Sequence, residues 1–350
     1  MKDLLKKLSE CFGPSGYEDG VRDLIREYVS HKIPEDVDVF EDKIGNLYVH
    51  FKNEGKPSLM INAHMDEVGF MVTGITENGY LKFGCVGGMN PIVIGGKRLV
   101  SERGIKGVVI TKPIHQMSAE DRKKPVPVSE MAIDIGATSY DDAKRYADVG
   151  DFFVFDSDYV EYGNGFVKCK ALDDRHGCAI MCKMIDAVKD GLKVEYDLWF
   201  AFTRREEISY SCAKCAAELV RPDIALVIES KAVQDIYGVA DEKKVCILGD
   251  GAIISFMDNS TIYDRDFVKH LKKICEENEI KYQMNKYISG GNDSSNIQKS
   301  ICGVKVGLLS AASRYIHSQA NVVKYSDLES ILDIGLCLIS DKPFTGGENK

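Results

Sequence analysis

The sequence has no long apolar run, no excess of basic residues and no repeated or low-complexity tract. No stretch approaches the roughly 18 uncharged apolar residues of a membrane-spanning helix, which excludes an integral membrane protein. The 54 acidic residues outnumber the 45 basic ones and give a net charge of −9, which argues against partners such as nucleic acid or a membrane surface. The segment GGKRLV at 95–100 lacks the spacing of a phosphate-binding P-loop.

A disulfide framework is also missing. The 11 cysteines are odd in number and scattered, mostly through apolar segments. The first residues, MKDLLKKLSECFG, are typical of a charged amphipathic helix and not of a secretory signal. We therefore expect a cytoplasmic protein with buried free thiols. The one CxxC motif, Cys212 to Cys215, has no second pair and no histidine at zinc-finger spacing, and its segment favours an ordinary helix.

A chain of 350 residues is longer than one hydrophobic core usually supports, so we expect one large domain and one smaller domain. Apolar periodicity predicts helices and strands that alternate along much of the chain. The predicted helices are 2–12, 18–31, 173–191, 211–220, 264–279 and 325–340, and the predicted strands are 37–41, 46–52, 57–64, 195–203, 223–230, 251–257 and 302–310. This alternation predicts the α/β class, with a doubly wound mixed sheet.

The stretch 70–160 has a different character. It contains short segments in which apolar and polar residues alternate, broken by glycines, such as GYLKFGCVG, and one charged segment, HQMSAEDRKKPVP. This pattern predicts an inserted small β domain at 70–160. Residues 1–69 and 161–350 then form the larger α/β domain.

Acidic and imidazole side chains gather where the predicted strands of the larger domain end. They are His64 and Asp66 after the first apolar strand, Asp173 and Asp174 before an apolar helix, Glu206 and Glu207 after LWFAFT, Glu229 at the end of IALVIES, and His317 in SRYIHSQA. Because such strand ends face one edge of a doubly wound sheet, we expect these side chains to converge. Imidazole and carboxylate ligands suit zinc, cobalt or manganese.

Each of these residues also has a structural explanation when it is considered alone. Asp173 or Asp174 is a candidate helix N-cap. Glu206 and Glu207 follow two arginines and resemble a solvated charge run, and a lone histidine such as His317 is more often structural than a ligand. A site with one carboxylate shared between two ions needs about five ligands, and five are available together with a base and a ring-orienting carboxylate. Convergence therefore favours the metal site.

Several segments, taken in order, resemble those of a known family. NAHMDEVGFMV, KALDDRHG, the Glu206–Glu207 pair, PDIALVIE and RYIHS are similar to the metal-binding segments of the tetrahedral (TET) aminopeptidases. These are dinuclear metallopeptidases whose members are sometimes labelled endoglucanases. The resemblance extends over nearly the whole chain, including the opening GPSGYE turn. It departs from the usual pattern at 208–217 and 291–296.

The resemblance implies a catalytic α/β domain that holds two divalent metal ions, and an inserted domain that assembles a homo-oligomer, from a dimer to a twelve-subunit particle. It makes Asp173 the bridging ligand and implies a cis peptide bond between Asp173 and Asp174. The implied roles of the other residues are these: His64 and Glu229 complete one metal site, Glu207 and His317 complete the other, Glu206 is the general base, and Asp66 is the partner of His64.

The leading hypothesis from the sequence is a metallo-aminopeptidase that removes N-terminal residues from short peptides. One alternative is a family member that has lost turnover and acts as an assembly or binding protein, suggested by the altered loops. A glycoside hydrolase is disfavoured, because adjacent glutamates in an extended segment would point in opposite directions.

Overall fold

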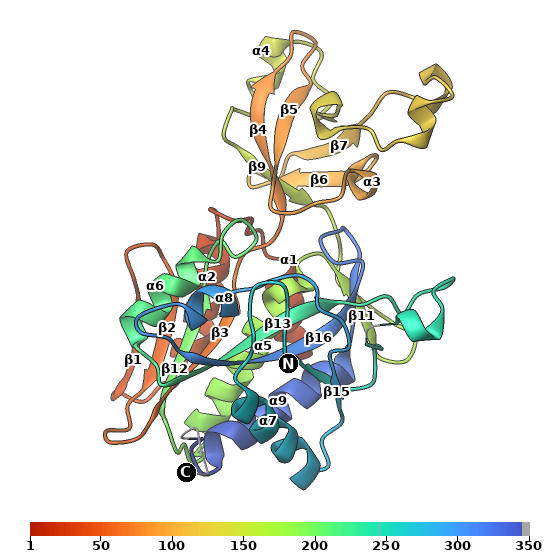
Figure 1. Ribbon diagram of the computed structural model, residues 1–350. Helices are drawn as coiled ribbons and strands as arrows, with labels where there is room; N and C mark the ends of the chain where they lie inside the picture. Colours follow the sequence, from red (N-terminus) through yellow and green to blue (C-terminus); the bar gives the residue numbers. More distant parts are fainter. Residues whose placement is uncertain (245, 345–350) are drawn as a thin grey trace.

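A mixed β-sheet forms the centre of the larger domain in the computed structural model, which describes residues 1–244 and 246–344 (Figure 1). Its main strand order is β1-β2-β12-β3-β13-β16-β17-β11-β10, and β14 pairs with both β15 and β16. The strands are β1 (Val37–Glu41), β2 (Leu47–Phe51), β3 (Ser58–His64), β10 (Val160–Tyr162), β11 (Phe166–Cys169), β12 (Asp197–Thr203), β13 (Ile224–Ala232), β14 (Ala252–Ile254), β15 (Tyr282–Met284), β16 (Lys305–Arg314) and β17 (Asn321–Lys324).

Four neighbouring strands at the centre, β12, β3, β13 and β16, run parallel to one another. In the register of β12 and β3, Thr203 is paired with His64, so these two strands end side by side. Their near-continuous apolar sequences are buried on both faces, as expected for strands in the interior of a parallel sheet. The carboxyl ends of all four strands therefore lie at one edge.

Helices that pack on the sheet fall into two groups, one around α5 and α9 and the other formed by α6 with α8. Their apolar positions recur at helical spacing, and α7 is capped by the Asp264 side chain, which accepts from the N–H groups of Asp266 and Phe267. The helices are α1 (Lys2–Glu10), α2 (Asp19–Ser30), α5 (Leu172–Lys189), α6 (Ser211–Val220), α7 (Arg265–Glu277), α8 (Ser294–Gln298) and α9 (Tyr325–Ser340).

A small closed barrel interrupts this domain between β3 and β10. Its strand order is β4-β5-β8-β7-β6-β9, and Figure 1 shows it standing apart from the larger sheet. The elements are β4 (Gly69–Ile75), β5 (Leu81–Val86), α3 (Pro91–Ile94), β6 (Arg98–Ser101), β7 (Lys106–Ile110), β8 (Ala132–Asp134), α4 (Tyr140–Ala143) and β9 (Phe152–Phe155). Single turns of 3₁₀ helix lie at Ile114–Gln116, Asp121–Lys123, Val128–Glu130 and Asp241–Lys243.

The barrel has a hydrophobic core of its own, distinct from the core of the larger domain. Phe70, Phe83, Phe153 and Phe155 are at its centre, and the Phe70 ring makes edge-to-face contacts with those of Phe83 and Phe155. In the described part of the chain, no helix combines the length and the apolarity required to cross a membrane.

The structure confirms the fold class expected from the sequence, an α/β protein with a mixed sheet and a separate small β unit. The predicted helices appear with ends shifted by one or two residues at most sites, and all 11 cysteines are free thiols. Six of these are buried, three are partly exposed, and Cys215 and Cys302 are exposed.

We predict that the barrel unfolds as a unit separate from the α/β domain. Phe155→Ala, at a side chain that is 1% exposed, should destabilise the barrel by about 3–5 kcal/mol through lost burial and a cavity. Hydrogen exchange should show faster opening of β4 to β9 while protection in β3, β12 and β13 stays unchanged. Val108→Ala, at an exposed position on β7, is the matched control. Equal loss of protection in both domains would show a single cooperative unit.

Candidate metal centre

The residues selected from the sequence meet at the carboxyl edge of the parallel strands. His64 is the last residue of β3, Glu206 and Glu207 follow the end of β12, and Glu229 lies near the end of β13. Asp173 comes from the start of α5, and His317 follows β16. The chain brings these side chains together because the strands are parallel and end at the same edge.

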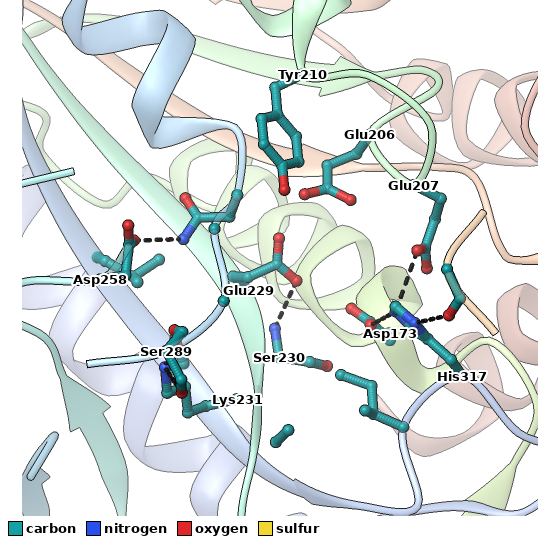
Figure 2. A pocket seen from close by; sticks show the side chains of 18 of the residues that line it. Asp173, Glu206, Glu207, Tyr210, Glu229, Ser230, Lys231, Asp258, Ser289 and His317 are labelled. Atoms are coloured by element: carbon teal, nitrogen blue, oxygen red, sulfur yellow. Dashed lines mark hydrogen bonds and ion pairs between the residues drawn. The ribbon is translucent and has the colours of Figure 1, made fainter. Parts of the chain in front are cut away.

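Asp173 stands between the two imidazoles. Its Oδ1 lies 3.5 Å from His64 Nε2, and its Oδ2 lies 3.3 Å from His317 Nε2. Each oxygen of one carboxylate thus faces a different ring. Figure 2 shows Asp173 beside His317 and Glu207 at one end of the pocket.

Three groups of potential ligands gather around this carboxylate, and the third consists of Asp173, Asp174 and Glu229. In the first, Glu229 Oε1 lies 3.7 Å and Glu206 Oε2 lies 3.9 Å from His64 Nε2. In the second, Glu207 Oε2 lies 3.1 Å from His317 Nε2, and Asp173 completes the group. Within each group the ligand atoms lie within 4.8 Å of one another.

In both imidazoles Nδ1 faces an acceptor and Nε2 faces the carboxylates. Asp66 Oδ1 lies 3.3 Å from His64 Nδ1, and the carbonyl oxygen of Gly88 lies 2.6 Å from His317 Nδ1. If Nδ1–H is the donor in each contact, Nε2 has a free lone pair, which is the tautomer a metal ligand needs. Gly88 belongs to the barrel, between β5 and α3, so the inserted unit also helps to orient a ring of the site.

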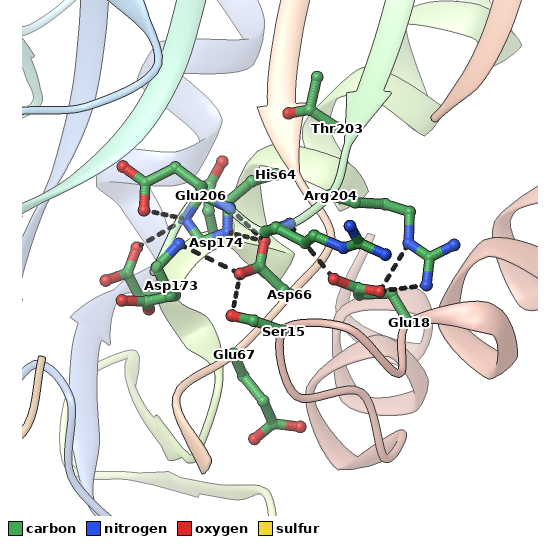
Figure 3. A network of polar contacts seen from close by, with 12 residues as sticks. Ser15, Glu18, His64, Asp66, Glu67, Asp173, Asp174, Thr203, Arg204 and Glu206 are labelled. Carbon is green, nitrogen blue, oxygen red and sulfur yellow. Dashed lines mark hydrogen bonds and ion pairs between the residues drawn. The ribbon is translucent and has the colours of Figure 1, made fainter. Parts of the chain in front are cut away.

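The Asp66 carboxylate joins three segments of the chain (Figure 3). It is fully buried and accepts hydrogen bonds from Ser15 Oγ at 2.5 Å, from Glu206 N–H at 3.0 Å and from Glu207 N–H at 3.1 Å. Together with its contact to His64, these bonds fix the positions of the first imidazole and of both glutamate backbones. The opening GPSGYE turn reaches the site through Ser15.

Glu206 and Glu207 lie in a turn after β12, and both side chains line the same cavity. The assumption of an extended segment, used above against a glycoside hydrolase, was therefore wrong. The structure also contradicts the interpretation of this segment as a solvated charge run, because the side chains of both glutamates are largely buried. Arg204 is buried as well, and its Nε donates to Glu18 Oε2 at 2.6 Å.

The start of α5 presents the two aspartates differently. The Asp173–Asp174 peptide bond is cis, as the resemblance implied. Of the two capping candidates, Asp174 is the one whose Oδ1 accepts from Gly177 N–H, at 3.2 Å. Its Oδ2 is buried without a hydrogen-bond partner, and Asp174 also lies in a group of potential ligands with Asp173 and Glu229. A Cβ atom at Gly177 would lie 2.5 Å from the Asp174 carboxylate, which explains the glycine at this position.

Crowding of carboxylates dominates the electrostatics of the cluster. Burial, with Asp173 nearby, raises the pKa of Glu229 to about 8, and burial also raises the pKa of Glu206 well above its ordinary value. Burial alone would lower the pKa of His317, but Glu207 and Asp173 raise it to about 11. Carboxylate charge is thus costly in this buried volume, and a bound cation would lower that cost.

The donor set fits divalent metal ions. Two imidazoles and several carboxylates offer the nitrogen and oxygen ligands that zinc and related ions take. Asp173 Oδ1 is buried and has no hydrogen-bond partner, and each carboxylate of the first two groups has an oxygen within 4.0 Å of a ring Nε2. We therefore regard His64, Asp173, Glu207, Glu229 and His317 as residues able to hold metal, with Glu206 beside them.

A cavity of about 670 Å³ opens beside the cluster. Sequence reasoning missed three of the residues near it. Tyr210 and Lys231 line the cavity, and Asp293, next to the lining residue Asn292, is buried, with its Oδ2 accepting from Thr203 Oγ1 at 2.8 Å. Tyr210 and Asp293 belong to the segments that depart from the family pattern, whereas Lys231 lies two residues beyond Glu229 and could have been identified from strand alternation.

Comparisons with known proteins agree with this geometry. A family profile described as M42 glutamyl aminopeptidase matches residues 45–334. The TET aminopeptidase of a marine sediment archaeon of the Thaumarchaeota has a TM-score of 0.92 and 31% identity, over 97% of this chain and 95% of that one. The TET1 peptidase of Pyrococcus horikoshii, which can assemble into a tetrahedron or a large octahedral shell, has a TM-score of 0.83 and 34% identity, over 97% and 98%. A lysyl aminopeptidase of Pyrococcus furiosus is 28% identical in an alignment of 349 positions that covers 97% of this chain and 96% of the relative.

The family match covers far more than half of the chain, and its range contains every candidate ligand and both candidate catalytic residues. Both solved structures share the fold over nearly the whole length. The chain therefore belongs to the M42 family of aminopeptidases, as the order of its motifs implied.

Proposed function

We propose that the protein is a cytoplasmic, metal-dependent aminopeptidase that removes N-terminal residues from short peptides with two divalent ions per subunit. The observation that supports this most directly is the position of Asp173, whose two oxygens face the Nε2 atoms of two different histidines. A carboxylate in that position is suited to bridge two ions. Zinc, cobalt and manganese all accept this ligand set.

In this proposal His64 and Glu229 hold one ion, Glu207 and His317 hold the other, and Asp173 is shared. Ions bound there would supply Lewis-acid chemistry, polarising the scissile carbonyl and making water a better nucleophile. Asp66 and the carbonyl of Gly88 face the Nδ1 atoms of the two rings, so the Nε2 atoms of both histidines face the ligand cluster. Asp66 is thus a positioning residue.

Glu206 is the proposed general base. Its carboxylate lines the cavity next to the ligand cluster, and its backbone N–H is held by Asp66. There it accepts the proton of the attacking water and returns it to the leaving amine. Burial raises the pKa of the Glu206 carboxyl above its ordinary value, so its carboxylate is a stronger base than that of an exposed glutamate.

We also propose a homo-oligomer in which the barrel makes contacts between subunits. Several large apolar side chains of the barrel are exposed, including those of Ile92 and Val149, which are 69% and 64% exposed. The assemblies formed by the Pyrococcus horikoshii relative support this proposal. Either a dimer or a twelve-subunit particle fits it.

We predict that the purified protein releases amino acids from unblocked short peptides but not from their N-acetylated forms. A chelator should abolish release, and zinc, cobalt or manganese should restore it. Elemental analysis of the restored protein should give two ions per chain. If metal-loaded protein releases no amino acid, the alternative of an assembly protein that has lost turnover is favoured. Cleavage of a β-glucan would favour the glycoside hydrolase alternative.

We predict different defects for the two neighbouring glutamates. Glu206→Gln should keep its metal but lose roughly 10²–10⁴ in kcat, because an amide cannot accept the proton of water. Glu207→Gln should first weaken metal binding, measured by titration, and excess metal should partly restore its activity. Glu35→Gln, at an exposed position, is the matched control. Near-normal kcat of Glu206→Gln at saturating metal and substrate would show that another group is the base.

We predict that the protein sediments as a homo-oligomer at micromolar concentration. Lysine cross-linking followed by mass spectrometry should give links between subunits within 70–160, because the barrel exposes both lysines and apolar side chains. A monomer, or links between subunits only outside this range, would contradict the assembly role of the barrel.

A further inference from the structure

Tyr210 extends from the turn after β12 into the cavity beside the metal centre. It follows Glu206 by four residues and directly precedes α6, so the turn that positions Glu206 also positions the tyrosine. Within this turn the N–H of Ser209 donates to the carbonyl oxygen of Arg205 at 2.9 Å. In Figure 2 the Tyr210 hydroxyl is directed toward the Glu206 carboxylate and the interior of the pocket. The hydroxyl therefore lies on the cavity side of the candidate base.

The Tyr210 hydroxyl makes no hydrogen bond with the residues that the structure describes. Its oxygen is open to the cavity, unlike that of Tyr159, which is buried without a partner. Tyr263, by contrast, uses its hydroxyl within the protein, where Oη donates to Asp258 Oδ2 at 2.5 Å. Tyr210 thus presents a free O–H group to a molecule that occupies the cavity.

Other donors that line the cavity have partners within the protein. Lys231 Nζ donates to the carbonyl oxygen of Ser289 at 2.7 Å, and Asn292 Nδ2 donates to Tyr263 Oη at 3.1 Å. Tyr210 differs from these residues because no acceptor in the described part of the chain uses its proton. Its hydroxyl can therefore bind a ligand without losing a bond to the protein.

Gly291 leaves the space that the Tyr210 hydroxyl needs. A Cβ atom at residue 291 would lie 3.3 Å from Tyr210 Oη and 2.8 Å from Ser260 Oγ, which is tighter than ordinary contact. A glycine at this position lets the two segments approach each other closely. The two residues belong to 208–217 and 291–296, the segments that depart from the usual family pattern. Both departures thus meet at one place in the cavity.

Tyr210 keeps its proton in this environment. Burial, together with the charges of Glu206 and Glu229, raises the pKa of the Tyr210 hydroxyl to about 12. A phenol in these surroundings is a hydrogen-bond donor at neutral pH and not a second base. The group that such a donor complements best is an oxygen that gains negative charge.

Peptide hydrolysis produces such an oxygen close to Glu206. The water that gives its proton to Glu206 must lie about 3–3.5 Å from the carbonyl carbon that it attacks. The oxygen of the same carbonyl is therefore close to the base as well. Tyr210 faces that base from the cavity, where the substrate enters.

We propose that Tyr210 is a further catalytic residue whose hydroxyl donates a hydrogen bond to the oxyanion of the tetrahedral intermediate. This inference rests on the proposed aminopeptidase function. As the water oxygen bonds to the carbonyl carbon, the π electron pair of the C=O bond moves to the carbonyl oxygen and Glu206 receives the proton. On collapse that pair forms the C=O bond again, the C–N bond breaks, and Glu206 passes the proton to the leaving amine. Tyr210 keeps its own proton throughout and stabilises the charged oxygen.

The first experiment compares Tyr210→Phe with the wild-type protein, both loaded with metal, on an unblocked peptide. Loss of one hydrogen bond to a charged oxygen predicts a kcat that is lower by roughly 10- to 100-fold. KM should change little, because the bond forms only after attack. The profile of kcat against pH should keep its shape, because Tyr210 transfers no proton. Tyr237→Phe, at an exposed tyrosine outside the cavity, is the matched control.

The second experiment needs no turnover. Leucine phosphonic acid has an anionic tetrahedral phosphonate where the substrate has its reacting carbonyl, so its oxygens imitate the oxyanion. Calorimetric titration should show that Tyr210→Phe lowers the affinity for this inhibitor by about the same factor as it lowers kcat/KM. Elemental analysis should give equal metal contents, and thermal unfolding should give equal Tm values, because the hydroxyl has no partner in the described protein.

Equal kcat and equal phosphonate affinity in the wild-type protein and Tyr210→Phe would overturn the proposal. A higher KM with unchanged kcat would overturn it as well, because the tyrosine would then contribute equally to substrate and transition-state binding. If the metal-loaded wild-type protein neither hydrolyses a peptide nor binds the phosphonate, that result counts against the aminopeptidase function itself.

Discussion

The hydrogen bonds of the Asp66 carboxylate are the constraint on which the rest of the site depends. Asp66 is fully buried, and its oxygens contact His64 Nδ1, Ser15 Oγ and the backbone N–H groups of Glu206 and Glu207. A buried carboxylate is costly unless such partners are present. The end of β3, the opening turn and the turn after β12 must therefore assemble together. Placement of the first histidine and of both glutamates follows from that single requirement.

The second histidine is held by a different part of the molecule. His317 Nδ1 contacts the carbonyl of Gly88, which belongs to the barrel, whereas His64 relies on Asp66 within the α/β domain. Both rings nevertheless direct Nε2 toward Asp173. The barrel, inserted at the carboxyl end of β3, therefore contributes to the site, because its position relative to the sheet affects the orientation of the His317 ring.

Much of the site could be predicted because parallel strands end at one edge. The apolar runs ending in His64, Glu206 and Glu229 were sufficient to place these residues together, since that inference needs only strand direction. The conformation of the Glu206–Glu207 turn could not be predicted, because it is held by hydrogen bonds that its N–H groups donate to Asp66, which is distant in the sequence. The same limit applies to the pairing of Arg204 with Glu18, which are 186 residues apart and have no local signal for each other.

Strand β13 gives the cavity its charge pattern. Glu229 and Lys231 have opposite charges and lie on one face, yet they do not pair: Glu229 accepts from Ser230 N–H and faces His64, and Lys231 donates to Ser289. The result is an acidic cluster and a separate cation, each held by contacts of its own.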